Sequence, residues 1–207
     1  FYFKNVAVKV TKNGIEEIKY EDLPMKIWQS RIVDRDYFPS KGVKSDFETF
    51  IYNLAGQNDI RFLALRSIIG YLLHRYQDPS VTRAVILLDE NISFNGAANG
   101  GTGKTLITDA LGEMRELVGM DGKNIKGNSW FKNQRITKTT DIVRYDDVQS
   151  DFSLETLYSM ITSGITVEKK YQDEFYINPK NAPKIVISSN YPIKGTGGST
   201  DERRRSI

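Results

Sequence analysis

A glycine-rich segment that runs directly into a lysine and a threonine is the part of this sequence best suited to chemistry. It reads Ala-Asn-Gly-Gly-Thr-Gly-Lys-Thr over 98–105, which is a Walker A pattern with alanine at its first position. Backbone N–H groups of such a loop can face a phosphate, and the following helix adds its positive end. Lys104 would reach the β- and γ-phosphates of ATP, and the Thr105 hydroxyl would hold Mg²⁺. We therefore expect the nucleotide-binding residues to be Asn99, Gly100, Gly101, Thr102, Gly103, Lys104 and Thr105.

Two adjacent carboxylates, Asp146 and Asp147, follow an apolar segment about forty residues after Lys104. Ligands of an open α/β sheet gather at the carboxyl ends of its strands, where this pair would lie. Asp146 is expected to bind Mg²⁺, directly or through water, and Asp147 to orient or deprotonate the attacking water. The alternative for such a pair is an exposed turn, and its place after an apolar strand favours the metal site.

The elements that must position these residues can be read from the periodicity of apolar residues. Strands are predicted at 84–88, 141–145 and 184–188, and helices at 104–120 and 154–161. Alternation of strands and helices indicates a mainly parallel α/β sheet. The first strand ends about ten residues before the glycines, so 89–97 is predicted to form an inserted excursion.

The amino-terminal part has a different pattern. Residues 1–20 predict a β-hairpin with Asn13-Gly14 as its two-residue turn. A helix follows, capped by Ser45 with Glu48, and a second apolar stripe predicts another helix that ends before Pro79. The expected domains are 1–44 (hairpin and connector), 45–80 (helical collar or linker) and 81–207 (ATPase core).

Composition excludes several classes of protein. No cysteine is present, which excludes disulfides and thiolate metal sites. No apolar run approaches a membrane span, so we expect no membrane partner and a place in the cytoplasm of a bacterium or host cell. The formal net charge of +3 is too small for a general nucleic-acid coat, so DNA contacts would come from local loops. Both ends are expected to be cut from a longer protein.

The segments 163–177 and 183–190 resemble the B′ motif and motif C of superfamily 3 helicases, which are AAA+-type P-loop ATPases. The resemblance is nearest to the helicase domain of phage and viral primase-helicases, and it covers roughly 84–207. It implies a P-loop NTPase (AAA+-like) core with a mainly parallel central sheet, preceded by a β-hairpin and a small helical region.

The resemblance also implies roles for single residues. Lys170 matches the B′ lysine of a hairpin that lines the channel of a hexameric ring, and the expected DNA-facing residues are Lys169, Lys170, Tyr171 and Gln172. A lysine there neutralises backbone phosphate without reading sequence. Asn190 matches the polar sensor of motif C, although a strand-ending asparagine also commonly begins a turn. Arg204, with Arg203 in reserve, stands where the family places its arginine finger.

The expected function is therefore an ATP-dependent DNA helicase motor for replication of a phage, plasmid or virus genome. Its partners would be single-stranded DNA, further copies of itself and a fused or separate primase. A remodelling or DNA-packaging ATPase without unwinding activity is the main alternative. A small-molecule kinase would need an acceptor site and a lid, and a non-catalytic module would not need Lys104, Thr105 and the two aspartates.

Overall fold

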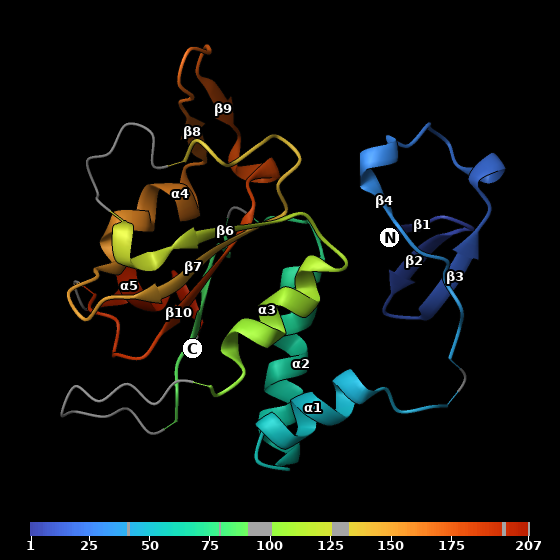
Figure 1. Ribbon diagram of the computed structural model, residues 1–207, viewed down its shortest axis with the longest axis horizontal. Coiled ribbons are helices and arrows are strands. Elements are labelled where there is room, and N and C mark those ends of the chain that lie inside the picture. Colours follow the sequence, from blue (N-terminus) through green and yellow to red (C-terminus); the bar gives the residue numbers. More distant parts are fainter. Residues whose placement is uncertain (41, 79, 91–100, 126–132, 196–197, 207) are drawn as a thin grey trace. The chain divides into compact units, whose positions relative to one another are not determined.

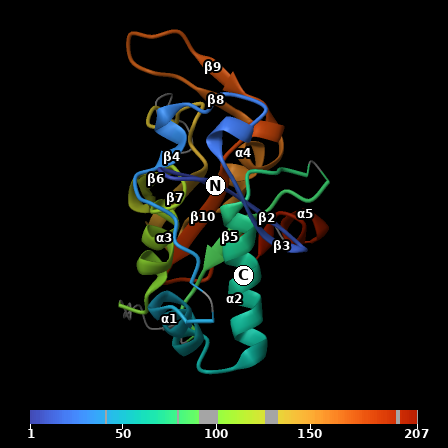
Figure 2. The same cartoon turned by 90° about the vertical axis from the view of Figure 1, so that its right-hand side faces the viewer.

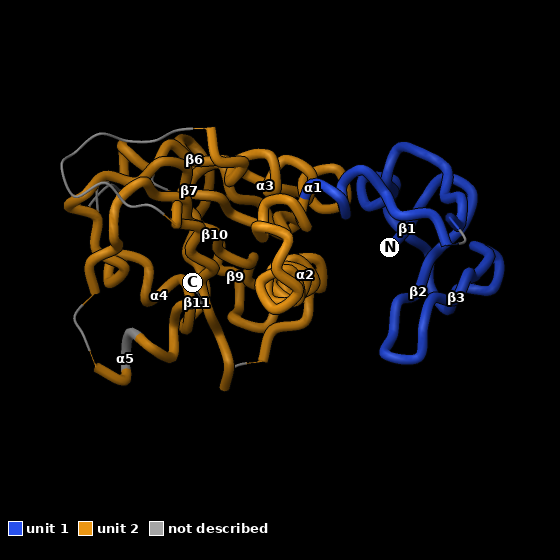
Figure 3. The backbone as a smooth tube through the Cα atoms, turned by 90° about the horizontal axis from the view of Figure 1, so that it is seen from below, with its two compact units in different colours: residues 1–50 blue, residues 51–207 orange. Residues whose placement is uncertain are grey.

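The computed structural model describes residues 1–40, 42–78, 80–90, 101–125, 133–195 and 198–206 of the 207. These form two compact units, Phe1–Phe50 and Ile51–Ile207 (Figure 3). Within the described residues no helix is long and apolar enough to cross a membrane.

The first unit contains a small four-stranded sheet in the order β3-β2-β1-β4. Its strands are β1 Tyr2–Phe3, β2 Ala7–Thr11, β3 Gly14–Ile18 and β4 Ile32–Val33, with short 3-10 turns at Tyr20–Asp22 and Gln29–Arg31. The predicted hairpin is present as β2 and β3. Thr11 pairs with Gly14, so the two-residue loop is Lys12-Asn13, one position before the predicted turn. Gly14 is instead the first residue of β3, with a φ of 126°.

Two helices come next in the sequence, α1 Asp46–Leu54 and α2 Asp59–Leu73. The predicted cap of α1 is present, because the Glu48 N–H donates to Ser45 Oγ at 3.0 Å. The Asn58 side chain caps α2 by accepting from the N–H groups of its first turn. Each cap satisfies backbone donors that the first turn of a helix leaves without intrahelical partners.

The second unit is built on a five-stranded sheet in the order β11-β5-β10-β7-β6, and every neighbouring pair is parallel (Figure 1). Its strands are β5 Ala84–Leu87, β6 Leu117–Asp121, β7 Ile142–Val148, β10 Lys184–Ser189 and β11 Arg205–Ser206. The structure thus confirms the predicted α/β class and the parallel sheet.

The predicted helix over 104–120 is wrong in its second half. Helix α3 covers Lys104–Gly112, and Leu117–Asp121 is the edge strand β6, paired with β7 over five positions. A short apolar run has no periodicity that separates helix from strand, and here the open edge of β7 decides the outcome. The predicted helix over 154–161 is a 3-10 turn, Leu154–Leu157, that continues into α4, Tyr158–Thr162. A fifth helix, α5, covers Ser199–Glu202, and further 3-10 turns cover Gly122–Asn124 and Pro179–Asn181.

Successive residues of the central strands are buried against different layers of helices, one on each face of the sheet. Val85, Leu87 and Val186 face Leu72 of α2 and Leu111 of α3. The residues between them in the strands pack in a cluster that includes Met160 and Ile161 of α4. Helix α4 lies on the other side of the sheet from α2 and α3 (Figures 1 and 2). Helices therefore cover both faces of the sheet, which is the arrangement that a buried parallel sheet requires.

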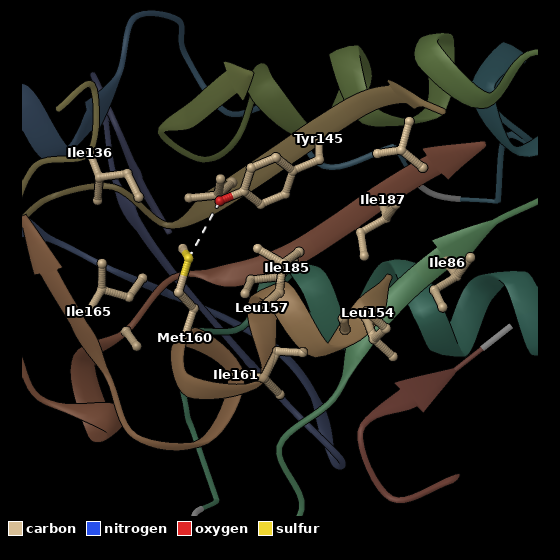
Figure 4. Close-up of a cluster of buried hydrophobic side chains, with 14 of the residues drawn as sticks. Ile86, Ile136, Tyr145, Leu154, Leu157, Met160, Ile161, Ile165, Ile185 and Ile187 are labelled. Atoms are coloured by element: carbon tan, nitrogen blue, oxygen red, sulfur yellow. Dashed lines mark hydrogen bonds between the residues drawn. The ribbon is translucent and has the colours of Figure 1, made fainter. Parts of the chain in front are cut away.

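The larger core lies on the α4 side of the sheet, as Figure 4 shows. Ile86, Ile185 and Ile187 of the strands are at most 2% exposed and meet Leu154 and Leu157. Tyr145 is the polar member of this cluster, and its hydroxyl donates to Met160 Sδ at 3.5 Å. Burial raises the pKa of Tyr145 far above its usual value, so the ring stays neutral in the core.

A separate antiparallel hairpin consists of β8 Ile165–Val167 and β9 Phe175–Ile177. Gly164 precedes it with a φ of +88°, and a Cβ at that position would lie 2.4 Å from the Ile177 carbonyl oxygen. Only glycine fits both the conformation and the close approach. A side chain at this position would therefore force the start of the hairpin to shift.

Candidate functional site

Polar side chains gather at the carboxyl edge of the parallel sheet. Asp89 follows β5, Asp146 and Asp147 lie near the carboxyl end of β7, and Asn190 follows β10. Because β10 lies between β5 and β7, Asn190 can contact groups that follow both neighbours. Lys104 begins α3 and brings the ammonium group to the same edge.

The Lys104 ammonium makes three hydrogen bonds within the chain. Its Nζ donates to Asp89 Oδ1 at 2.5 Å, to Asn190 Oδ1 at 3.0 Å and to Thr102 Oγ1 at 3.2 Å. The side chain is only 15% exposed, and that of Asp89 only 7%. An ammonium has three N–H donors, so all three are engaged in this conformation.

Asn190 links Lys104 to the acidic pair. Its amide oxygen accepts from Lys104, and its Nδ2 donates to Asp147 Oδ1 at 2.8 Å. The other oxygen of Asp147 lies 2.7 Å from Lys123 Nζ, and this carboxylate raises the pKa of Lys123. One continuous chain of contacts therefore runs from Asp89 through Lys104, Asn190 and Asp147 to Lys123.

A local irregularity of the sheet orients the two aspartates differently. The pairing of β10 with β7 shifts register between Ile187 and Ser189, and Asp147 adopts a φ of 54°. Its N–H donates to Ser188 Oγ at 2.9 Å, while the Ser188 hydroxyl donates to Asp146 Oδ1 at 2.5 Å. A positive φ in a non-glycine residue is uncommon, and such strain is concentrated at functional sites.

Asp146 is also joined to α3 through an arginine. Arg144 Nε lies 3.8 Å from Asp146 Oδ2, and its Nη1 donates to Thr108 Oγ1 at 2.8 Å and to Asp109 Oδ1 at 2.5 Å. Thr108 and Asp109 lie on the helix that begins with Lys104. Arg144 thereby links Asp146 to the helix that begins with Lys104.

The glycine-rich segment is described from Gly101 onward, and the predicted residues Asn99 and Gly100 lie outside the described part of the chain. Gly101 and Gly103 have φ values of 88° and 90°, a conformation that side chains disfavour. Their identity is therefore required by the backbone that leads into α3.

Thr105 and Asp146 offer the donors that a magnesium ion prefers. Both are oxygen ligands, and both are accessible: Thr105 is exposed and the Asp146 side chain is 33% exposed. Within the described ranges no group of three or more acidic or histidine side chains could hold a metal alone. A hydroxyl and one carboxylate suit an ion that takes its other ligands from water and phosphates.

The predicted DNA-facing residues lie in the loop that joins β8 to β9. Tyr171 is 92% exposed with a φ of 60°, and the Gln172 N–H donates to the Lys169 carbonyl at 3.3 Å. Lys169 Nζ lies 5.8 Å from the Phe175 ring and Lys170 Nζ 5.2 Å from the Tyr171 ring. Strand β9 leads through a 3-10 turn into the start of β10, so the hairpin leaves the amino edge of the sheet, away from the start of α3 (Figure 1).

The predicted finger arginines also lie at the amino edge. Arg205 pairs with Ala84, the first residue of β5, and the Ala84 N–H donates to the Arg204 carbonyl at 2.8 Å. The Arg204 guanidinium lies 4.8 Å from the Tyr158 ring centroid, and Arg203 is exposed. The fold therefore does not bring these arginines to the Lys104 contacts of their own chain.

Sequence reasoning missed Asp89, Lys123 and Ser188. Asp89 gave a detectable signal, since it is a carboxylate at the end of an apolar strand, as Asp146 is. Lys123 became a neighbour of Asp147 only because 117–121 forms a strand beside β7. Ser188 looked like an ordinary strand residue, and the register shift alone turns its hydroxyl to both aspartates.

Comparison with known proteins gives one family and a fold. The family of unknown function DUF5906 matches residues 97–205, just over half of the chain. No curated protein matches. Among solved structures, the A form apo structure of the NrS-1 C-terminal region is 17% identical with a TM-score of 0.57, over 96% of this chain and 43% of that one. This chain thus spans less than half the length of that neighbour, and the likeness is one of fold. By its sequence, the chain belongs to the family of unknown function DUF5906.

Proposed function

We propose that this chain is the ATP-hydrolysing motor of a DNA helicase that replicates a phage, plasmid or virus genome. The observation that carries the proposal is the contact chain Lys104–Asn190–Asp147, with bonds of 3.0 and 2.8 Å. These residues come from a helix start and from the ends of two strands. A phosphate-binding lysine, a polar sensor and a carboxylate thereby share one edge of the sheet.

Each residue has a distinct task in this proposal. Lys104 neutralises charge on the terminal phosphates and remains bonded to them as charge shifts during transfer. Asp147 accepts a hydrogen bond from the attacking water and holds it for in-line attack. Asn190 contacts both, so its amide reports the loss of the γ-phosphate to the Asp147 side and to β10. The backbone N–H groups near Gly101 and Gly103 cradle the phosphates.

Thr105 and Asp146 are the residues that would hold Mg²⁺, Asp146 directly or through water. The ion, when bound, neutralises developing negative charge on the phosphates. Ser188 and Arg144 would hold the Asp146 carboxylate in place for it, at 2.5 and 3.8 Å. In P-loop enzymes of this kind, catalysis is mainly positioning and electrostatic stabilisation, and these contacts supply both.

The β8–β9 hairpin is the proposed contact to single-stranded DNA. Lys169 and Lys170 would neutralise backbone phosphates, while Tyr171, which is 92% exposed, offers a ring for base stacking. Because Arg203 and Arg204 lie at the far edge of the sheet, a finger arginine would act on the ATP of a neighbouring copy. This geometry supports a ring of copies, as the resemblance to superfamily 3 helicases implies.

One observation favours the second candidate, a remodelling or packaging ATPase that does not unwind DNA. The loop 168–174 contains two lysines but three carboxylates, Glu168, Asp173 and Glu174, so its formal charge is 2 − 3 = −1. A net negative loop is a weak attractor of phosphate. If the loop contacts a protein instead, ATPase activity would be insensitive to DNA.

The test is ATP hydrolysis by the full-length protein, with and without single-stranded DNA, followed by a strand-displacement assay. We expect magnesium-dependent hydrolysis that single-stranded DNA stimulates, together with displacement of a paired strand. Lys104→Ala should abolish hydrolysis, and a thermal melt must accompany it, because the variant leaves the buried Asp89 carboxylate without its ammonium partner. Hydrolysis that ignores DNA would favour the second candidate, and hydrolysis equal in wild type and Lys104→Ala would refute an ATP site here.

A further inference from the structure

Asp89 is a buried carboxylate at the centre of the Lys104 contacts. It lies two residues after β5 and is 8% exposed. Its Oδ1 accepts hydrogen bonds from the Thr102 hydroxyl and from Lys104 Nζ, the latter at 2.5 Å. This carboxylate accepts from a lysine and a threonine of the glycine-rich segment, so it takes the place at Lys104 that a phosphate of the nucleotide would occupy.

The hydrogen bonds of Lys104 leave no donor for an incoming phosphate. All three N–H groups are engaged, by Asp89, Thr102 and Asn190. A triphosphate must therefore replace at least one partner. Thr102 and Asn190 are neutral and can remain beside a phosphate, whereas a carboxylate and a phosphate repel each other at short range. Asp89 is thus the partner whose bond the nucleotide must break.

We propose that Asp89 is a positioning residue that stands in for a phosphate before nucleotide binds, and that it sets the affinity and the metal dependence of binding. The inference rests on the proposed function, because it concerns the same ATP site. With Asp89 in place, the lysine is pre-oriented toward the strand ends and its charge is cancelled. Metal-free ATP carries more negative charge than its magnesium complex, so the carboxylate opposes metal-free ATP more strongly.

The experiment measures ATP binding by titration calorimetry with the full-length protein, both with Mg²⁺ and with a chelator. We expect Asp89→Asn to bind ATP roughly tenfold more tightly, because a charge-assisted competitor for Lys104 is removed. The gain should be larger in the chelator. Asp89→Ser, a smaller neutral replacement, should give the same direction, and thermal unfolding should establish that each variant is folded.

Asp141→Asn is the matched control. Asp141 is also 8% exposed, and its Oδ1 lies 2.7 Å from Arg75 Nε, but it precedes β7 at the amino edge of the sheet. Loss of this half-buried ion pair should lower the unfolding temperature and leave ATP affinity unchanged. An effect that came merely from weakening the fold would appear in both variants.

The outcomes separate the two proposals. If wild type binds ATP and both Asp89 variants bind it equally or more weakly, the inference is overturned and the ATP site stands. If wild type and Asp89→Asn both fail to bind ATP, the proposed function is refuted and the inference falls with it. Tighter binding that is equal with and without Mg²⁺ would overturn the proposed role in metal dependence.

Discussion

Asn190 is the residue whose substitution tests the site most sharply. In the sequence it has two interpretations, a sensor of phosphate or the first residue of a turn into Pro192. In the structure the turn is held by its neighbour: Ser189 Oγ donates to the Tyr191 carbonyl at 2.8 Å and accepts from the Tyr191 N–H at 3.0 Å. Asn190 itself bonds Lys104 and Asp147.

Asn190→Ala removes two hydrogen bonds to charged groups. Loss of such a bond lowers the free energy of unfolding by about 1.5–3 kcal/mol when the charged partner keeps no other hydrogen bond. Here Lys104 keeps Asp89 and Thr102, and Asp147 keeps Lys123. We therefore expect a smaller loss, about 1–2 kcal/mol, and a fall in Tm of roughly 2–8 °C for a chain of this size.

The expected effect on catalysis is larger. Removing one donor or acceptor that acts on developing charge lowers kcat by about 10²–10³-fold in well-studied enzymes. If Asn190 acts mainly in the transition state, kcat should fall by this factor while KM for ATP changes less than about threefold. Phosphate release measured over a range of ATP concentrations separates the two constants.

Ser189→Ala is the matched control for this variant. It removes the two turn bonds next to Asn190 and leaves the Lys104–Asn190–Asp147 contacts intact. We expect a comparable fall in Tm with kcat kept within a few fold. The reasoning is refuted if Asn190→Ala retains kcat, or if Ser189→Ala loses as much activity as Asn190→Ala.

Three further predictions concern the core and the hairpin. Burial lowers the pKa of Lys184 to about 8 from 10.5, so between these pH values the unfolded chain binds more protons than the folded chain. The Tm of the wild type should therefore rise relative to that of Lys184→Met as the pH increases from 8 to 10, which parallel thermal melts at several pH values would measure. Gly164→Ala should lower the free energy of unfolding by about 2–5 kcal/mol, and Gly56→Ala by about 1–2 kcal/mol. Both glycines have a positive φ, but only at Gly164 would a Cβ lie 2.4 Å from the Ile177 carbonyl oxygen. Equal losses in denaturant titrations would contradict this clash. Lys170→Ala should retain ATP binding and lose stimulation by single-stranded DNA, and equal loss of both would assign the lysine to the nucleotide site.

The residues that could do chemistry were largely visible in the sequence, because their signals are local. Gly101 to Thr105 form a contiguous pattern, and Asp146 and Asn190 each follow a run of apolar residues. Parallel strands end at one edge of a sheet, so a position after a strand already predicts where such a residue lies. The α/β class followed from the same alternation of strands and helices.

The tertiary structure alone decided which of these residues touch. Lys104 bonds Asp89, a contact across fifteen positions that depends on how the end of β5 meets the start of α3. Lys123 reaches Asp147 because β6 completes the open edge of β7, which a short apolar run could not indicate. Arg204 is placed at the amino edge by strand pairing with β5, which no local pattern specifies. The types and spacing of side chains can be read from the sequence. The pairing of charges depends on strand order and register, which are determined only when the sheet packs.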